Sequence, residues 1–330
     1  MTDPDTLRPF TVVREGDSGL ERLPRPFVAI GNFDGVHRGH RAVIGQAIDR
    51  ARAAHRPAAV LTFEPHPRSF FRPDESSFHL SSEAAKLRLL ASTGLDGAIL
   101  LTFDAALAHL SAEDFVQNIL VDRLAVSGAV IGFNFHFGKD RRGSPDFLKA
   151  QGAHHGFSVD VVPPFMLDRR RVSSGAVRDA LSAGHIAEAN ELLGYPWFVT
   201  AQVVHGDKRG RTLGYPTANL RLGTDCGLKH GIYAVRVGLS GTLYDGVASF
   251  GRRPTFDNGA VLLEVFLFDF SGDLYGAVLD VAFIGWIRPE LKFDDVDALI
   301  RRMDQDSSQA RHLLARAAAA FPPLGNPSAE

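Results

Sequence analysis

Near its start the chain reads Gly31-Asn32-Phe33-Asp34-Gly35-Val36-His37-Arg38-Gly39-His40. The apolar run Phe27-Val28-Ala29-Ile30 precedes this stretch and predicts a buried strand. Apolar residues at helical spacing follow it over residues 41–55 and predict a helix. The stretch is therefore the turn from a strand into a helix, where open α/β sheets bind their ligands.

Three glycines and two histidines in this turn suit it to binding an anion. Gly31, Gly35 and Gly39 allow a ligand and the backbone to approach closely. His37 and His40 are three residues apart, so they share one face at the helix start and can meet one anion. The spacing fits neither the dinucleotide fingerprint nor the P-loop. Taken alone, the pair could also be two solvated histidines.

Length and composition limit the class of protein. A chain of 330 residues with 45% hydrophobic and 22% charged residues predicts two globular domains. The net charge of -2 argues against a general polyanion binder such as a nucleic-acid-binding protein. A single cysteine, Cys226, excludes an internal disulfide and indicates a cytoplasmic protein. Residues 1–17 have no apolar core typical of a signal peptide, and no run is long enough to span a membrane.

The first half alternates strands with helices, which predicts a Rossmann-like, doubly wound parallel sheet. Buried strands are expected at residues 27–30, 58–63, 97–103, 128–133 and 157–162, with a further strand at 11–14. Helices are expected to begin near residues 41, 82, 111 and 145, with Ser111 and Ser144 as caps of the last two.

Polar segments follow two of these strands. His66 and Arg68 follow the end of the strand at 58–63. They could line a ligand crevice, or they could belong to an ordinary loop. Residues 132–143 mix phenylalanines with Lys139, Arg141 and Arg142. Such a segment could stack on a planar ring and meet phosphate, or its phenylalanines could belong to the core.

A basic segment closes the first half. Three arginines at residues 169–171 lead into a helix that Ser173 or Ser174 can cap. Arg178 lies about one turn further and can reach an anion at the helix start. Composition alone indicates no more than a capped helix beside a basic loop.

After residue 196 the pattern changes to short alternating strands. Apolar runs at residues 198–204, 231–239, 242–249, 261–268 and 277–283 predict a small closed antiparallel barrel, followed by a helix over 294–320. The expected domains are residues 1–186 and 198–330, joined by a helical linker end at 187–197.

The barrel half contains one segment dense in glycine and charge, at residues 206–219. An anion-binding loop is predicted from Gly206, Lys208, Gly210, Arg211 and Gly214. Thr217 and Asn219 then offer two neutral oxygens, enough for Mg²⁺ together with substrate phosphates. A glycine-rich hairpin is the alternative. Glu264 lies within an apolar strand, and Arg253 and Phe256 follow the strand before it, where they could close over a ligand.

Together these motifs resemble a known family. The first half is similar to the HxGH nucleotidylyltransferases, and nearly the whole chain resembles the bacterial bifunctional riboflavin kinase/FAD synthetases. The resemblance implies that His37 and His40 contact an ATP triphosphate, while Ser174 and Arg178 hold the leaving pyrophosphate. Two departures stand out, because Gly175 replaces a threonine of the family signature and Asn134 replaces an aspartate.

The resemblance also implies the remaining roles. In the kinase half, Thr217 and Asn219 would bind Mg²⁺ and Glu264 would deprotonate the riboflavin 5′-hydroxyl. Phosphate binding is implied for Gly31, Phe33, Asp34, Gly35, Gly39, Ser173, Ser174, Gly206, Lys208, Gly210, Arg211 and Gly214. Flavin binding is implied for His66, Arg68, Asn134, Arg253, Phe256 and Arg288.

The implied function is a two-step synthesis from riboflavin and ATP, through FMN, to FAD, with Mg²⁺ as cofactor and no nucleic-acid or membrane partner. Two alternatives stay open. The barrel could be a flavin-binding regulator beside a lone adenylyltransferase, or the chain could be an RNA-binding protein, which the charge disfavours. The sequence gives no oligomeric state.

Overall fold

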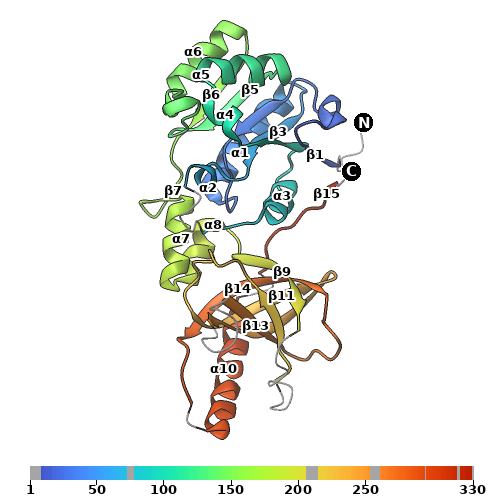
Figure 1. Cartoon of the computed structure of the whole chain (residues 1–330), viewed down its shortest axis with the longest axis vertical. Coiled ribbons are helices and arrows are strands. Elements are labelled where there is room, and N and C mark those ends of the chain that lie inside the picture. Colours follow the sequence, from blue (N-terminus) through green and yellow to red (C-terminus); the bar gives the residue numbers. More distant parts are fainter. Residues whose placement is uncertain are drawn as a thin grey trace. The chain divides into compact units, whose positions relative to one another are not determined.

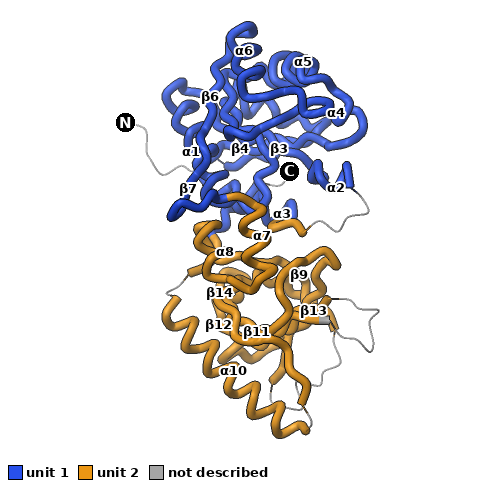
Figure 2. Tube along the Cα trace, turned by 90° about the vertical axis from the view of Figure 1, so that its left-hand side faces the viewer, with its two compact units in different colours: residues 1–77, 82–172, 323–330 blue, residues 78–81, 173–322 orange. Residues whose placement is uncertain are grey.

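A computed structural model describes residues 9–72, 78–205, 215–252, 261–293, 295–317 and 320–328. The chain forms two compact units (Figure 2). The first comprises residues 1–77, 82–172 and 323–330, and the second comprises residues 78–81 and 173–322. The functional boundary expected after residue 186 stays a prediction, because a catalytic domain and a compact unit need not end at the same residue.

The first unit is built on a seven-stranded sheet in the order β15-β1-β4-β3-β2-β5-β6, and all neighbouring strands in it are parallel (Figure 1). Its strands are β1 (Phe10–Val13), β2 (Phe27–Ile30), β3 (Ala58–Glu64), β4 (Gly97–Thr102), β5 (Gly128–Gly132), β6 (Ser158–Val162) and β15 (Pro327–Ser328). The predicted parallel sheet is confirmed. Only β15 was not foreseen, since two residues cannot show a strand pattern.

Helices connect these strands. They are η1 (Ser18–Arg22), α1 (Arg38–Ala53), α2 (Pro67–Phe71), α3 (Glu83–Ala91), α4 (Ala105–His109), α5 (Ala112–Asp114), the π-helical η2 (Phe115–Arg123), η3 (Lys139–Arg141) and α6 (Pro145–His155), with a small hairpin of β7 (Met166–Leu167) and β8 (Arg170–Arg171). The two predicted caps are confirmed. Ser111 Oγ accepts from the Asp114 amide at 2.9 Å, and Ser144 Oγ accepts from the Phe147 amide at 3.1 Å.

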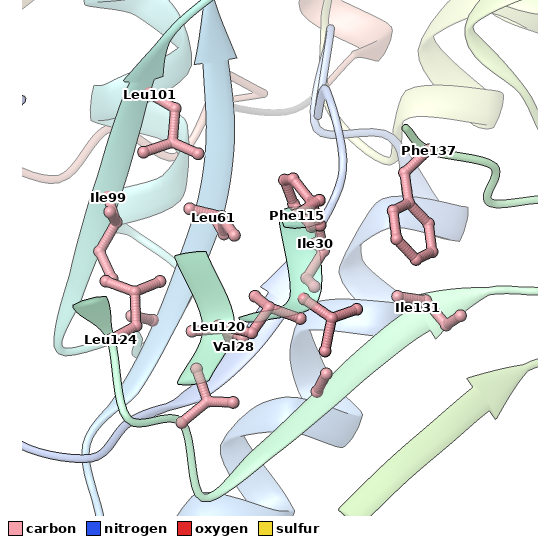
Figure 3. Packing of buried hydrophobic residues seen from close by; sticks show 14 of the residues in the cluster. Val28, Ile30, Leu61, Ile99, Leu101, Phe115, Leu120, Leu124, Ile131 and Phe137 are labelled. Atoms are coloured by element: carbon pink, nitrogen blue, oxygen red, sulfur yellow. The ribbon is translucent and has the colours of Figure 1, made fainter. Parts of the chain in front are cut away.

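Alternation along β2 explains why helices cover both faces of this sheet. Val28 and Ile30 point to one face and pack in a buried cluster with Phe115 and Leu120 of η2 (Figure 3). Ala29 points to the other face, where α1 packs on β2, β3 and β5. Each fully buried aliphatic side chain stabilises the fold by about 1.5–3 kcal/mol. The doubly wound arrangement therefore follows from strands that are apolar on both sides.

The order of the strands indicates where a sheet of this kind binds its ligand. The chain continues from β2 to its neighbour β3, but β5 lies on the other side of β2. This reversal makes the carboxyl ends of β2 and β5 a topological switch point, where sheets of this kind bind ligands. The turn with the two histidines follows β2 directly.

The second unit contains α7 (Ser174–Ala183), α8 (Ile186–Leu193) and a closed barrel in the order β10-β13-β12-β11-β14-β9. The strands are β9 (Phe198–Val204), β10 (Ala218–Arg221), β11 (Gly231–Leu239), β12 (Thr242–Arg252), β13 (Val261–Leu267) and β14 (Val278–Arg288). The predicted antiparallel barrel is confirmed. Sequence missed β10, whose four residues gain their ladder partners only from the distant β9 and β13.

Helix α10 (Val296–Arg316) packs on the outer face of β11, β12 and β14. Its buried Ala310 and Leu314 contact the barrel cluster. Buried Arg236 of β11 holds the helix end, because its guanidinium donates to the carbonyl oxygens of Leu314 and Ala320 at 3.3 and 3.1 Å. Within the described part of the chain, no helix has the length and apolar character needed to cross a membrane.

Candidate active sites

The turn after β2 has an uncommon backbone. Phe33, Gly35 and Val36 have φ angles of 51°, 78° and 35°. Glycine adopts such angles readily, but a β-branched residue such as valine is strained there. Strain of this kind tends to gather at functional sites, where the surrounding structure holds it in place.

His37 begins helix α1 as its N-cap. Its Nδ1 accepts a hydrogen bond from the His40 amide at 3.1 Å, so the proton of the neutral ring lies on Nε2 and can be donated to an acceptor. The rings of His37 and His40 stack at 3.6 Å with 14° between their planes. Phe33 supports this stack with an edge contact to His40 at 5.3 Å. The two imidazoles thus form one block at the helix start, as their spacing predicted.

The glycines of this turn make room for protein rings. A Cβ on Gly39 would lie 3.2 Å from both Cε1 and Nδ1 of His37, and a Cβ on Gly31 would lie 3.3 Å from Cζ of Phe33. Phe33 itself is 1% exposed, and Asp34 is also buried. Gly39 therefore leaves room for the His37 ring, a role that the sequence did not reveal.

The neighbouring strand ends carry the other predicted residues of this unit. His66 caps α2 by accepting from the Arg68 amide at 3.1 Å, beyond the end of β3. Asn134 is exposed beyond the end of β5. Phe137 is buried and stacks on Phe135 at 5.4 Å, so it belongs to the core, as the alternative for this segment proposed.

The second basic motif opens α7, in the second unit. Ser173 is the N-cap, since its Oγ accepts from the Ala176 amide at 3.2 Å. Arg178 Nε donates to the carbonyl oxygen of Phe78 at 2.5 Å. At Gly175 a Cβ would meet only the Ser173 oxygen, at 3.7 Å, so the backbone there would accept the side chain that the family signature has.

In the barrel, five residues on five neighbouring strands lie opposite one another across the sheet. The cross-strand row runs Asn219, Glu264, Ser249, Ile232 and Arg288. Residues directly opposite each other share a face. The next pair, Leu220 and Leu263, is fully buried, so the row faces outward, on the side that carries α10.

Asn219 has the properties of a cation ligand. It is 6% exposed, and its Nδ2 donates to the Thr217 carbonyl at 3.4 Å. Its Oδ1 is buried and accepts no hydrogen bond from the described residues. A buried oxygen left in this way suits a hard cation such as Mg²⁺. Since no group of three or more His, Cys, Asp and Glu side chains gathers among the described residues, substrate phosphates would have to complete the coordination.

A second carboxylate, Glu290, lies near Glu264. A Cβ on Gly251 would overlap the Glu290 carboxylate, so this glycine lets the carboxylate approach β12. Burial and then the charge of Glu264 raise the pKa of Glu290, while His230 and Arg288 oppose the rise. Sequence analysis missed Glu290, although it follows Arg288 within one short segment.

Arg288 is held by the protein itself. Its Nε donates to both oxygens of Asp306 on α10 at 2.9 and 3.0 Å, and its Nη1 donates to the Pro289 carbonyl at 2.8 Å. Both side chains of the pair are buried, and Arg302 Nε lies 3.2 Å from Asp306. The flavin-binding role of Arg288 stays a prediction, and the geometry supports first a structural one.

Several predicted residues lie outside the described ranges: Gly206, Lys208, Gly210, Arg211, Gly214, Arg253 and Phe256.

Comparison with known proteins matches both halves. A family model described as FAD synthetase matches residues 21–176, and one described as riboflavin kinase matches residues 193–314. A bifunctional riboflavin kinase/FMN adenylyltransferase of Pseudomonas fluorescens is 42% identical over 88% of this chain and 93% of its own. Relatives of the same description from Haemophilus influenzae and Escherichia coli K12 are 40% and 39% identical, over 86% and 90% of this chain and 92% and 96% of theirs.

A solved structure is also similar. A protein of Streptococcus pneumoniae, called a macrolide-efflux protein, matches with a TM-score of 0.81 at 32% identity and covers 92% of this chain and 99% of its own. The fold is thus shared along almost the whole chain. The name of the pneumococcal protein says nothing of flavins, whereas both family models and the curated relatives do.

Proposed function

This chain belongs to the family of bifunctional riboflavin kinase/FMN adenylyltransferases, and from that premise we propose which residues perform each reaction. The enzyme phosphorylates riboflavin with ATP to give FMN and ADP. It then transfers AMP from a second ATP to FMN, which gives FAD and pyrophosphate. The kinase reaction belongs to the barrel half and the adenylyl transfer to the α/β half.

In the kinase reaction, we assign the general base to Glu264. Its carboxylate accepts the proton of the riboflavin 5′-hydroxyl while the oxygen of that hydroxyl attacks the γ-phosphorus of ATP, and ADP leaves. The observation that carries this assignment is the position of Glu264 directly opposite Asn219. Thr217 and Asn219 would hold Mg²⁺, which supplies charge neutralisation on the phosphates when bound.

In the adenylyl transfer, an FMN phosphate oxygen attacks the α-phosphorus of ATP and pyrophosphate leaves. His37 and His40 are proposed to stabilise the developing charge, because their stacked imidazoles stand together at a helix N-terminus. Ser174 and Arg178 are proposed to hold the pyrophosphate. Because the ring of Phe33 is buried, a phosphate contact there would come from its backbone.

Flavin contacts in this half are proposed for His66, Arg68 and Asn134. They follow β3 and β5, the two neighbours of β2, at the carboxyl edge of the sheet. We also propose that the enzyme works in a reducing, cytoplasmic compartment, since its one cysteine cannot form an internal disulfide.

A time course tests the function. Pure protein is incubated with riboflavin, ATP and MgCl₂, and the flavins are separated at intervals. We expect FMN to appear first and FAD to follow, with pyrophosphate released in proportion to FAD. If FAD forms from added FMN but riboflavin is never phosphorylated, the barrel is a flavin-binding regulator. Replacing MgCl₂ with MnCl₂ or CaCl₂ then identifies the metal requirement.

A further inference from the structure

Tyr215 connects the proposed metal site to helix α10. It lies two residues before Thr217, its ring packs on Phe266 at 4.9 Å, and its hydroxyl donates to the carboxylate of Asp304 on α10. Phe266 follows Glu264 by two residues on β13, so both point to the outer face of the barrel.

Helix α10 can serve as a fixed reference for this contact. Two residues after Asp304, the buried Asp306 forms its ion pair with Arg288 of β14. Arg236 of β11 holds the far end of the helix. A hydrogen bond from Tyr215 to this helix therefore ties the residues before β10 to the same framework as β11 and β14.

We propose that Tyr215 and Asp304 form a positioning contact that holds Thr217 beside Asn219 and Glu264, whose own register is set by the pairing of β10 with β13. The contact has this meaning only if the kinase site is the one proposed above. Residues 215–217 precede β10 and are not part of its ladder, and Pro216 has no N–H to donate. Their position thus depends on side-chain contacts, of which the Tyr215 hydroxyl and ring provide two.

Phosphoryl transfer makes such a contact matter, since it depends mainly on the positions of the phosphates, the metal and the base. Asp304 touches no reacting atom in this scheme. It acts through Tyr215, and Tyr215 acts through Thr217, the proposed metal ligand that lies outside the β10 ladder. Loss of the contact is expected to weaken binding of Mg–ATP while leaving riboflavin binding unchanged.

The variant Tyr215→Phe tests this, because it removes the hydroxyl and keeps the ring on Phe266. We expect the KM for Mg–ATP in the kinase reaction to rise about 5- to 10-fold, the size expected for a typical intramolecular hydrogen bond. The KM for riboflavin and the conversion of added FMN to FAD should stay as in the unchanged enzyme. Tyr244→Phe, on β12, is the matched control and should leave all constants unchanged.

Variants of the partner complete the test. Asp304→Ala should reproduce the effect of Tyr215→Phe, Asp304→Asn should restore most of the affinity because it keeps an acceptor, and the double variant should be no worse than either single one. Unchanged KM for Mg–ATP in Tyr215→Phe, or additive effects in the double variant, would overturn the positioning contact. Asn219→Ala distinguishes failure of the positioning contact from failure of the proposed metal site. If Asn219→Ala also leaves Mg–ATP binding intact, the proposed metal site itself is wrong.

Discussion

Asn219 and Glu264 lie directly opposite each other on the antiparallel strands β10 and β13. Side chains in this relationship have Cβ atoms about 4.5–5.5 Å apart. A cation bound to the Asn219 oxygen and a hydroxyl bonded to the Glu264 carboxylate would therefore lie close together, as attack of that hydroxyl on a cation-bound phosphate requires. In the proposed kinase site, these two adjacent strands would supply the cation ligand and the proton acceptor that phosphoryl transfer uses.

The role of Glu264 is tested by Glu264→Gln, which keeps the size of the side chain and removes its basicity. We expect kcat for FMN formation to fall by about 10²- to 10⁴-fold, the range of general-base catalysis. Conversion of added FMN to FAD should continue at the normal rate, and it serves as the control in the same preparation. A kinase rate within threefold of the original would mean that another group takes the proton.

His40→Ala tests the stacked histidines. The substitution removes one imidazole and leaves His37 without its stacking partner, so FAD synthesis should fall by about 10²- to 10³-fold, as for loss of a charge-stabilising donor. Phosphorylation of riboflavin should not change. His154→Ala, at an exposed position of α6, is the control, and an equal loss in both variants would contradict the assignment.

Two glycines of the same helix provide a matched pair. Alanine at Gly39 would crowd the His37 ring, whereas alanine at Gly45 has nothing within 4 Å. Gly45→Ala should raise the free energy of unfolding by up to about 1 kcal/mol, because alanine is the better helix former. Gly39→Ala should lack this gain and lose most FAD synthesis. Denaturant titration and the FMN-to-FAD assay on both variants provide the check.

The ion pair between Arg288 and Asp306 should matter for stability. Both partners are buried, so Asp306→Ala leaves an uncompensated charge and is expected to cost about 3–5 kcal/mol, seen as a melting temperature lower by roughly 10 °C. Asp269→Ala breaks a pair with Arg311 of the same helix, but that pair is exposed and its loss should be barely measurable. Thermal unfolding followed by circular dichroism compares the two, and equal shifts would contradict the burial argument.

Cys226 should react slowly in the folded enzyme. Burial raises the pKa of its thiol to about 11, so at pH 8 the folded protein holds it protonated. Alkylation by iodoacetamide at pH 8 should then be about 100-fold slower than for an ordinary thiol, and should accelerate as the pH rises. The same raised pKa means that its contribution to stability is present below about pH 8 and is lost as the pH approaches 11. Mass spectrometry before and after unfolding in guanidinium measures the difference.

The sequence predicted those features that depend on neighbouring residues. Three such features are confirmed by the structure: the strand before Gly31, the shared face of the two histidines, and the caps at Ser111 and Ser144. Each depends only on residues that are close together in the sequence. The parallel sheet followed from the alternation of strands and helices in the first half, and the barrel followed from the change of pattern after residue 196.

Features that join distant segments could not be predicted. Strand β10 exists because β9 and β13 pair with it, and Glu290 meets Gly251 only after the barrel closes. In the sequence, Asp304 and Asp306 are two acidic residues of a predicted helix, and no neighbouring residue indicates their partners. Their partners, Tyr215 and Arg288, come from other parts of the chain, and only packing brings them together.

The short strand β15 pairs with β1, so the chain leaves the first unit at residue 172 and returns to it at residue 323. Conversely, residues 78–81 come from the N-terminal part of the chain but belong to the second unit. Within that unit, the buried indole of Trp197 donates to the carbonyl oxygen of Leu80 at 2.8 Å. A gene cut once between the halves would deprive one product of an edge strand and the other of a core partner. To study either activity alone, the other activity should therefore be removed by a point substitution in the intact chain.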